Sequence, residues 1–133
     1  MFLLDTSVLT RLSTPLILQR IEELDSEGLA RSTMTDLEVG YSARNADEWD
    51  RLIVALGAFR RIDVEEHHFE RARQVQRELA TRGLKGRKVP DLLIAAVAEG
   101  ASLTVLHYDA DFEHIATVTG QPTQWIVERG SID

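Results

Sequence analysis

The sequence predicts one α/β domain over residues 1–133, an α/β/α sandwich in which helices cover both faces of a central parallel sheet. Three observations predict it. The chain has 133 residues, of which 44% are hydrophobic, enough for one core without metal or disulfide cross-links. Short apolar segments typical of strands alternate with amphipathic segments along the whole length. No low-complexity linker, internal repeat or break in composition separates a second domain.

The first part of the chain predicts a strand followed by two helices. The apolar run Phe2 to Leu4 ends abruptly at Asp5, as a buried strand does, and a helix can begin at Thr6. Apolar residues then recur at helical spacing between Pro15, which suits the start of a helix, and Gly28, which suits the residue after its end.

The next segments predict a strand and two helices. The strand covers Leu29 to Thr33, and a helix follows from Asp36, with Leu37, Tyr41 and Val39 expected to face inward. The helix after it has apolar residues at intervals of three and four and can end at a glycine. These residues are Trp49, Leu52, Ile53, Leu56 and the terminal Gly57.

A third strand is predicted over Phe59 to Val64, where apolar and polar residues alternate loosely. A long helix follows from about Glu66 to Arg82. One side of this helix is expected to carry Phe69, Ala72, Val75, Gln76 and Leu79.

The last part of the chain predicts a buried helix and two further strands. Pro90 suits the beginning of a helix, Leu92 to Ala98 is apolar on nearly every face, and Gly100 ends the segment. The remaining predicted elements are a strand over Leu103 to Leu106, a helix over Asp111 to Val118 and a strand over Gln124 to Val127. Right-handed crossovers between parallel strands would bring the strands' carboxyl ends to one edge.

Charge is distributed unevenly along the chain. The net charge is -7 and there is no cysteine, which excludes disulfides and thiolate chemistry and argues against a uniformly basic nucleic-acid binder. The window from Arg71 to Lys88 nevertheless holds seven basic residues against Glu78 alone, a charge of +6, and leaves -13 elsewhere. Such a division can steer a polyanion while an acidic pocket holds cations, although a solvated helix surface explains the window equally well.

The N-terminal residues have no basic segment followed by an apolar stretch of secretory length. The longest apolar run elsewhere, Leu92 to Ala98, is far shorter than the roughly 20 residues that a bilayer span requires. We therefore expect a soluble, cytoplasmic protein that does not associate with a membrane.

Acidic residues stand where predicted strands end or predicted helices begin. They are Asp5, Glu38, Asp91 and Asp109, with Asp111 two residues further on. If the strands before Asp5 and Asp109 are neighbours, these carboxylates lie close together, and Glu38 and Asp91 approach from the first turns of flanking helices. Such crowding is unfavourable unless a cation is present. Carboxylate oxygens without thiolates favour Mg²⁺ or Mn²⁺, ions that promote phosphodiester hydrolysis.

Taken singly, each acid also has a purely structural interpretation. Glu38 completes a capping-box pattern that begins at Thr35, and Asp91 lies in a first helical turn, where it complements the helix dipole. Asp5 and Asp109 can be ordinary N-caps. Capping does not explain why the most apolar helix and two strand ends all carry acids, so the set favours a shared site.

Four segments of the sequence resemble the signature regions of PIN-domain proteins, specifically of VapC-like toxins. They are residues 3–9 (LLDTSVL), 32–40 (STMTDLEVG), 90–96 (PDLLIAA) and 106–112 (LHYDADF), and they occur in the family order. The resemblance extends from residue 1 to about residue 127. It implies a PIN-like fold and a ribonuclease that is the toxin of a type II toxin–antitoxin system.

The resemblance also implies roles for individual residues. Asp5, Glu38, Asp91 and Asp109 would hold one or two Mg²⁺ or Mn²⁺ ions, with Asp111 as a fifth acid. Thr6 or Ser7 would contact a metal-linked water or a phosphate. The family forms homodimers and binds a cognate antitoxin whose C-terminal segment lies across the active site, and both are implied here.

Other residues are given simpler roles. The basic loop that carries Lys85, Arg87 and Lys88 precedes Asp91 and is the expected contact with the RNA backbone. The histidines are not expected to act as general bases, even His107 near Asp109, because hydrolysis at a metal site needs no imidazole. Trp49 and Trp125 are expected in core or dimer packing.

Three alternatives remain open from the residues. A phosphoacceptor signalling domain would need a pair of acids after the first strand and a lysine after a late strand, whereas only Asp5 follows the first strand and the lysines are Lys85 and Lys88. A PIN nuclease without a toxin role is the second alternative. A binding module whose acids hold no metal is the third.

Overall fold

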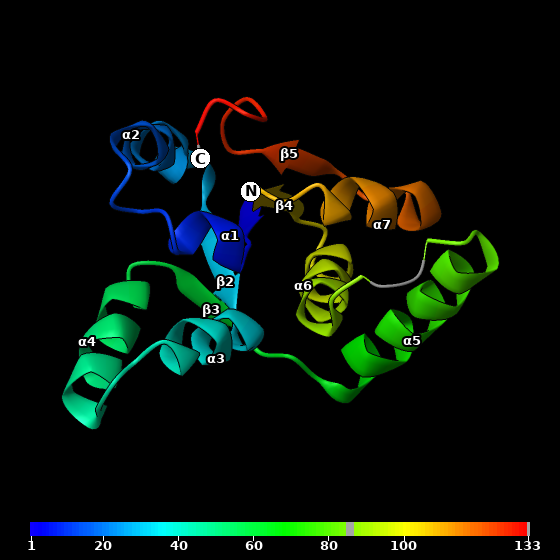
Figure 1. Cartoon of the computed structure of the whole chain (residues 1–133), viewed down its shortest axis with the longest axis horizontal. Helices are drawn as coiled ribbons and strands as arrows, with labels where there is room; N and C mark the ends of the chain where they lie inside the picture. The colour runs from blue at the N-terminus through cyan, green and yellow to red at the C-terminus, as the bar shows by residue number, and fades with distance from the viewer. Residues whose placement is uncertain (85–86, 133) are drawn as a thin grey trace.

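A computed structural model describes residues 1–84 and 87–132 and contains a five-stranded parallel sheet with helices packed around it (Figure 1). The strands follow the order β3-β2-β1-β4-β5, and every pair of neighbours is parallel. Their bounds are β1 Phe2–Leu4, β2 Leu29–Ser32, β3 Arg60–Ile62, β4 Thr104–His107 and β5 Thr123–Trp125. The predicted α/β/α fold with a central parallel sheet is therefore confirmed.

The helices connect successive strands, and most begin and end within a few residues of the predicted limits. They are α1 Thr6–Leu9, α2 Pro15–Leu24, the 3-10 helix η1 Asp25–Glu27, α3 Thr33–Tyr41, α4 Ala46–Leu56, α5 Glu66–Thr81, α6 Val89–Gly100 and α7 Asp111–Thr119. Among the described residues, no helix is both long and apolar enough to span a bilayer.

Two apolar cores lie on the two faces of the sheet, because successive side chains of a strand point to opposite faces. Leu3 of β1 belongs to the core formed with α5, α6 and α7, whereas its neighbours Phe2 and Leu4 belong to the core formed with α1, α2 and α4. Residues Leu92 to Ala98 of α6 are all buried, as predicted. The sheet is thus covered on both faces and β1 is buried throughout.

The strand order reverses direction at the β1–β4 pair. From β1 the chain adds β2 and β3 on one side, then crosses over to add β4 and β5 on the other. Leu4 is paired with Leu106, and the N–H of Asp5 donates to the Leu106 carbonyl at 2.9 Å. In open parallel sheets such a reversal leaves a crevice at the carboxyl ends of the two strands.

Helix α3 departs from the prediction. It begins at Thr33, three residues before the expected start at Asp36, and Ser32 is its N-cap. Leu37 and Tyr41 were expected to face inward, but they are 67% and 92% exposed. Thr35 and Val39, four residues apart and so on the same face, form the buried side of the helix.

Parts of two other apolar stripes are also exposed. Phe69 and Gln76 of α5 face solvent, and the buried side of that helix consists of His68, Ala72, Val75 and Leu79. Trp49 of α4 is partly exposed but packs against α3, where a Cβ added at Gly40 would lie 2.4 Å from the Trp49 Nε1 atom. Glycine at position 40 therefore allows α3 and α4 to approach each other.

Candidate active site

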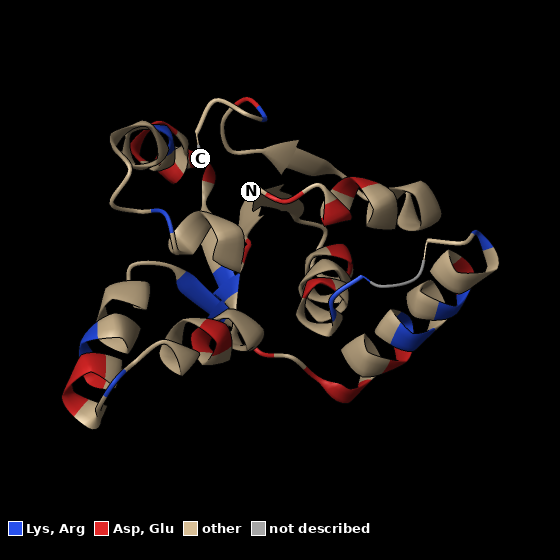
Figure 2. Ribbon diagram, viewed as in Figure 1, with Lys and Arg blue, Asp and Glu red and all other residues tan. Residues whose placement is uncertain are grey.

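An open pocket of about 240 Å³ lies at the carboxyl ends of β1 and β4, where the strand order reverses. Figure 2 shows acidic segments on α6 and at the start of α7 near this edge, with a basic segment leading into α6. The pocket is lined by Asp5, Thr6, Ser7, Thr10, Arg11, Glu38, Lys88, Asp91, Tyr108 and Asp109. Residues far apart in sequence therefore meet here.

Asp5 directly follows β1 and is 2% exposed. It is the N-cap of α1, because its Oδ2 accepts a hydrogen bond from the Ser7 N–H at 2.9 Å. Its Oδ1 is buried and has no hydrogen-bond partner among the described residues. Burial raises the pKa of Asp5 to about 6, and the nearby charges of Glu38 and Asp109 act in the same direction.

Asp91 lies in the first turn of α6, one residue after Pro90, and is 4% exposed. Its Oδ2 is buried without a hydrogen-bond partner among the described residues, and the Lys88 Nζ is 3.7 Å from it. Burial, followed by repulsion from Asp5, raises the pKa of Asp91 to about 8. The ionised forms of Asp5 and Asp91 are therefore both unfavourable in the metal-free protein.

Asp109 follows β4 and is held in place by three hydrogen bonds. Its Oδ1 accepts from the Asp111 N–H at 2.9 Å, its Oδ2 accepts from Lys88 Nζ at 2.9 Å, and its own N–H donates to His107 Nδ1 at 3.2 Å. Burial acts to raise the pKa of Asp109, but the Asp111 N–H and Lys88 outweigh it, so the pKa lies below its usual value. Asp109 therefore stays ionised.

Glu38 enters the pocket from α3. It is in the second turn of that helix and not in the first, as the sequence predicted, because the helix begins early. Its Oε1 accepts a hydrogen bond from the Thr6 hydroxyl at 2.7 Å, and the Thr6 oxygen also lies 2.9 Å from the Thr35 hydroxyl. The capping-box interpretation was wrong, since Ser32 caps α3.

The acids provide the ligands that a divalent cation requires. Single carboxylate oxygens of Asp91, Asp109 and Asp111 lie within 4.8 Å of one another. Asp5 and Glu38 lie outside this closely spaced group, but Asp5 lines the same pocket and repels Asp91 electrostatically. A bound cation would give the buried, unpaired oxygens of Asp5 and Asp91 a partner, so this set of oxygen ligands fits a hard divalent ion.

Two of the three predicted basic contacts form ion pairs with acidic residues of the site. Lys88 bonds to Asp109, and Arg87 forms an ion pair with Asp111 at 2.7 Å. The hydrogen bond to Asp109, helped by the charges of the nearby carboxylates, outweighs the effect of burial and raises the pKa of Lys88 to about 12. Lys85, the third predicted contact, lies outside the described residues.

Sequence reasoning missed Thr10, Arg11 and Tyr108, which also line the pocket. Arg11 is four residues after Ser7, the spacing of one helical turn, and its Nη1 donates to the Ser7 carbonyl at 2.7 Å. That spacing after a helix start was the only available signal. Tyr108 lies between two residues that the sequence analysis considered, His107 and Asp109.

None of the four histidines lines the pocket. His107 is the last residue of β4 and is fully buried, and its Nδ1 accepts the Asp109 N–H. Burial lowers the pKa of His107 to about 4, so the ring is neutral near pH 7. His68 is buried at the start of α5, where its Nδ1 accepts from the Glu65 N–H.

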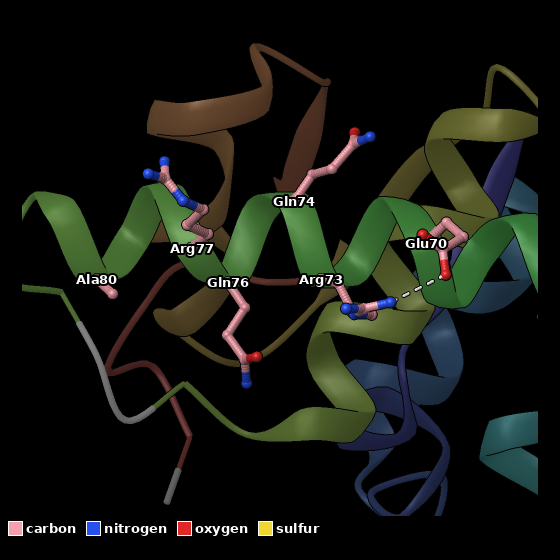
Figure 3. A pocket seen from close by; sticks show the side chains of 6 residues that line it. All are labelled: Glu70, Arg73, Gln74, Gln76, Arg77 and Ala80. Carbon is pink, nitrogen blue, oxygen red and sulfur yellow. Dashed lines mark hydrogen bonds and ion pairs between the residues drawn. The ribbon is translucent and has the colours of Figure 1, made fainter.

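A second hollow lies along α5, and all of its lining residues that belong to the described part of the chain are on that helix (Figure 3). Arg73 and Glu70 form an ion pair across one turn, whereas Gln74 and Gln76 point in different directions. Among the described residues, it brings together none from distant parts of the chain. The pocket at the end of β1 is therefore the better candidate for chemistry.

Comparison with known proteins identifies close relatives. The PIN domain family model matches residues 2–118. Ribonuclease VapC51 of Mycobacterium tuberculosis is 59% identical over 133 residues, covering 99% of this chain and 97% of that protein. Ribonuclease VapC21 of the same species is 40% identical over 137 residues, covering 98% and 96%.

Solved structures have the same fold at lower sequence identity. VapBC2 from Rickettsia felis, bound to a promoter DNA fragment, matches with a TM-score of 0.77 and 18% identity, covering 92% of this chain and 96% of that chain. DNA-bound VapBC from Salmonella typhimurium matches with a TM-score of 0.76 and 22% identity, covering 95% and 98%.

Proposed function

The chain belongs to the PIN-domain family, and from this premise we propose that it is a divalent-metal-dependent endoribonuclease, the toxin of a toxin–antitoxin pair. Its close relatives over nearly the full length are named ribonucleases. The observation that carries the proposal is the pair of buried carboxylate oxygens, Asp5 Oδ1 and Asp91 Oδ2, that have no hydrogen-bond partner among the described residues. In their ionised form such groups are costly unless a cation binds them.

Asp5, Asp91 and Asp109 are the proposed principal metal ligands, with Glu38 and Asp111 completing the set. When bound, Mg²⁺ or Mn²⁺ would polarise the phosphate, orient a water for in-line attack and neutralise charge on the leaving oxygen. The hydrogen bond from Thr6 orients Glu38, and the Ser7 N–H and the Asp111 N–H fix one oxygen each of Asp5 and Asp109. The chain thus presents oriented carboxylates before substrate arrives.

The cationic residues bind the substrate in this proposal. Lys88 and Arg87 neutralise Asp109 and Asp111 in the metal-free protein. A divalent ion held by those acids would take over this neutralisation, leaving both side chains to contact RNA phosphates, with Lys85 beside them in sequence. Thr6 and Ser7 line the same pocket, where either would contact a metal-linked water or a phosphate.

The biological setting is proposed from the same premise. The protein acts in the cytoplasm as one domain over residues 1–133, forms a homodimer, and is neutralised by a cognate antitoxin. A PIN nuclease without a toxin role is the alternative. A short open reading frame for a DNA-binding antitoxin immediately upstream of the gene would favour the toxin, and its absence would favour the alternative.

Cleavage of a panel of RNAs tests the proposed chemistry. We expect cleavage with Mg²⁺ or Mn²⁺, none with EDTA, and a loss of roughly a hundredfold or more in Asp5→Asn, because weakened metal sites lose activity on that scale. Asp50→Asn is the matched control, since Asp50 is an exposed residue of α4 outside the pocket. Cleavage that survives both EDTA and Asp5→Asn would overturn the mechanism.

A further inference from the structure

Two cations line the acidic pocket, and they are held differently. Lys88 is bound by Asp109. Arg11 forms no ion pair with any carboxylate among the described residues, although the pocket that it lines is acidic. Its guanidinium is held by the Ser7 carbonyl and lies over the Tyr108 ring, with its Cζ atom 5.2 Å from the ring centroid.

Ser7 fixes Arg11 relative to the catalytic acids. The Ser7 carbonyl accepts from Arg11 Nη1 at 2.7 Å, and the Ser7 N–H donates to Asp5 Oδ2 at 2.9 Å. The Ser7 hydroxyl accepts from the N–H of Tyr108 at 2.9 Å, one residue before Asp109. One residue therefore sets the positions of the guanidinium, of the ring beneath it and of a carboxylate.

This arrangement leaves the charge of Arg11 available to an anion. A guanidinium has five N–H donors, and among the described residues only the Arg11 Nη1 atom has an acceptor. The Nε atom is buried without a partner among them, whereas Nη2 is not buried, so the two Nη atoms are the donors that an anion can reach. A backbone carbonyl and an aromatic face hold the group in place without cancelling its charge. A structural guanidinium of this protein pairs with a carboxylate, as the buried Arg31 does with Asp36.

We infer that Arg11 is a substrate-binding residue that takes a phosphate oxygen of the RNA backbone at the α1 side of the pocket. The inference rests on the proposed ribonuclease function. Arginine suits this contact because its planar fork matches phosphate oxygens in two parallel hydrogen bonds. In this assignment the acids bind the metal, and Arg11 binds the RNA backbone.

The salt dependence of RNA binding tests this assignment. The probe is a fluorescein-labelled single-stranded RNA of mixed sequence, with Ca²⁺ in place of Mg²⁺ and the RNA checked for integrity after each titration. We expect Arg11→Met to weaken binding roughly tenfold at low salt and to make the plot of log Kd against log salt shallower by about 0.7, the value for one phosphate contact on a single strand.

Two further variants separate charge from anchoring. Arg11→Gln retains a donor for the Ser7 carbonyl but loses the charge, so it is expected to match Arg11→Met. Arg11→Lys retains the charge and is expected to keep the wild-type slope. Arg51→Met is the matched control, because Arg51 is exposed on α4 and lies outside the pocket. Calorimetric affinity for Mn²⁺ is expected to be the same in all variants.

Three outcomes would overturn the inference. Unchanged affinity and slope in Arg11→Met and Arg11→Gln, while the wild type binds and cleaves RNA, would refute it and leave the proposed function standing. If the Arg11 variants lost affinity for Mn²⁺ and for RNA to the same extent, the role of Arg11 would be to stabilise α1 and not to bind substrate. A wild-type protein that neither binds nor cleaves RNA would refute the proposed function, and the inference with it.

Discussion

At the scale of single residues, a carboxylate can cap a helix and serve a site at once because it has two oxygens. Asp5 caps α1 with Oδ2, while Oδ1 is buried without a partner among the described residues. Asp109 is not the N-cap of α7, which is Ala110, but one of its oxygens accepts the Asp111 N–H and the other accepts from Lys88. The capping and metal-site interpretations are therefore compatible for Asp5, since capping fixes the direction of its remaining oxygen.

The raised pKa of Asp91 predicts a pH dependence of stability. An unfolded Asp91 ionises near 3.8, whereas the folded one keeps its proton up to about 8, so the metal-free protein loses stability as the pH rises through this range. Below pH 6.5 the lowered pKa of His107 and the raised pKa of Asp5 act with opposite signs. Between pH 6.5 and 8, Asp91 dominates and is expected to remove roughly 1.5 kcal/mol.

Urea unfolding in EDTA measures this loss. Asp91→Asn cannot ionise, so its free energy of unfolding is expected to stay nearly constant over the same interval and to exceed that of the wild type at pH 8. Saturating Mn²⁺ is expected to reverse the order, because only the wild type has the ligand. Equal slopes for the two proteins in EDTA would show that Asp91 is not buried as a neutral acid.

Lys88 is predicted to compete with the metal for Asp109. Its Nζ lies 2.9 Å from Asp109 Oδ2 and 3.7 Å from Asp91 Oδ2. Lys88→Met is therefore expected to bind Mn²⁺ more tightly, by up to about tenfold, and RNA more weakly. Calorimetry and RNA binding measure the two effects, with Arg44→Met, on the exposed Arg44–Glu48 pair, as control. Weaker Mn²⁺ binding in Lys88→Met contradicts the prediction.

At the scale of elements, periodicity predicted the strands and helices well where one face of an element is uniformly apolar. Residues Leu92 to Ala98 are all buried, and Gly57 follows α4 as predicted. For α3 the prediction was confirmed at Val39, which is buried, and wrong for Leu37 and Tyr41, because Thr35 makes the rest of the buried side. Helix α3 has a polar buried side because Thr35 bonds to Thr6 at the site, so local packing outweighed hydrophobic pattern.

A buried arginine joins three elements, and the segment before β3, and could not be predicted. Arg31 of β2 is 6% exposed, and its guanidinium donates to the carbonyls of Leu56 and Phe59 and to Asp36 of α3 at 2.6 Å. In the sequence, this residue interrupts an apolar strand and resembles a solvent-facing side chain. Its acceptors are backbone atoms at the end of α4 and before β3, which no sequence pattern reveals.

Removing the carboxylate partner of Arg31 is predicted to destabilise the fold. Asp36→Ala leaves a buried positive charge without its counterion, which costs about 3 kcal/mol in the free energy of unfolding. Asp63→Ala is the control, because the Arg61–Asp63 pair is exposed, and its loss is expected to cost less than about 1 kcal/mol. Similar values for the two variants in urea unfolding would contradict the role given to Arg31.

At the scale of the whole molecule, the charge asymmetry is less simple than the sequence indicated. Arg71 pairs with Glu99, and Arg73 pairs with Glu70, so part of the +6 window is neutralised locally. Steering of RNA by this window stays a prediction. The gathering of the acids follows from topology, since adjacent parallel strands β1 and β4 end at the same edge. The sequence could not show that Asp91, Asp109 and Asp111 come closest, because that depends on how α6 and α7 begin.

Calorimetric titration of metal-free protein with Mn²⁺ tests most directly whether these distant acids form one cation site. The account predicts binding of one or two ions by the wild type, at least about tenfold weaker binding by Asp91→Asn and by Asp5→Asn, and unchanged binding by the surface control Asp50→Asn. Absence of Mn²⁺ binding by the wild type, with and without RNA, would contradict it, as would binding that is unaffected by Asp91→Asn.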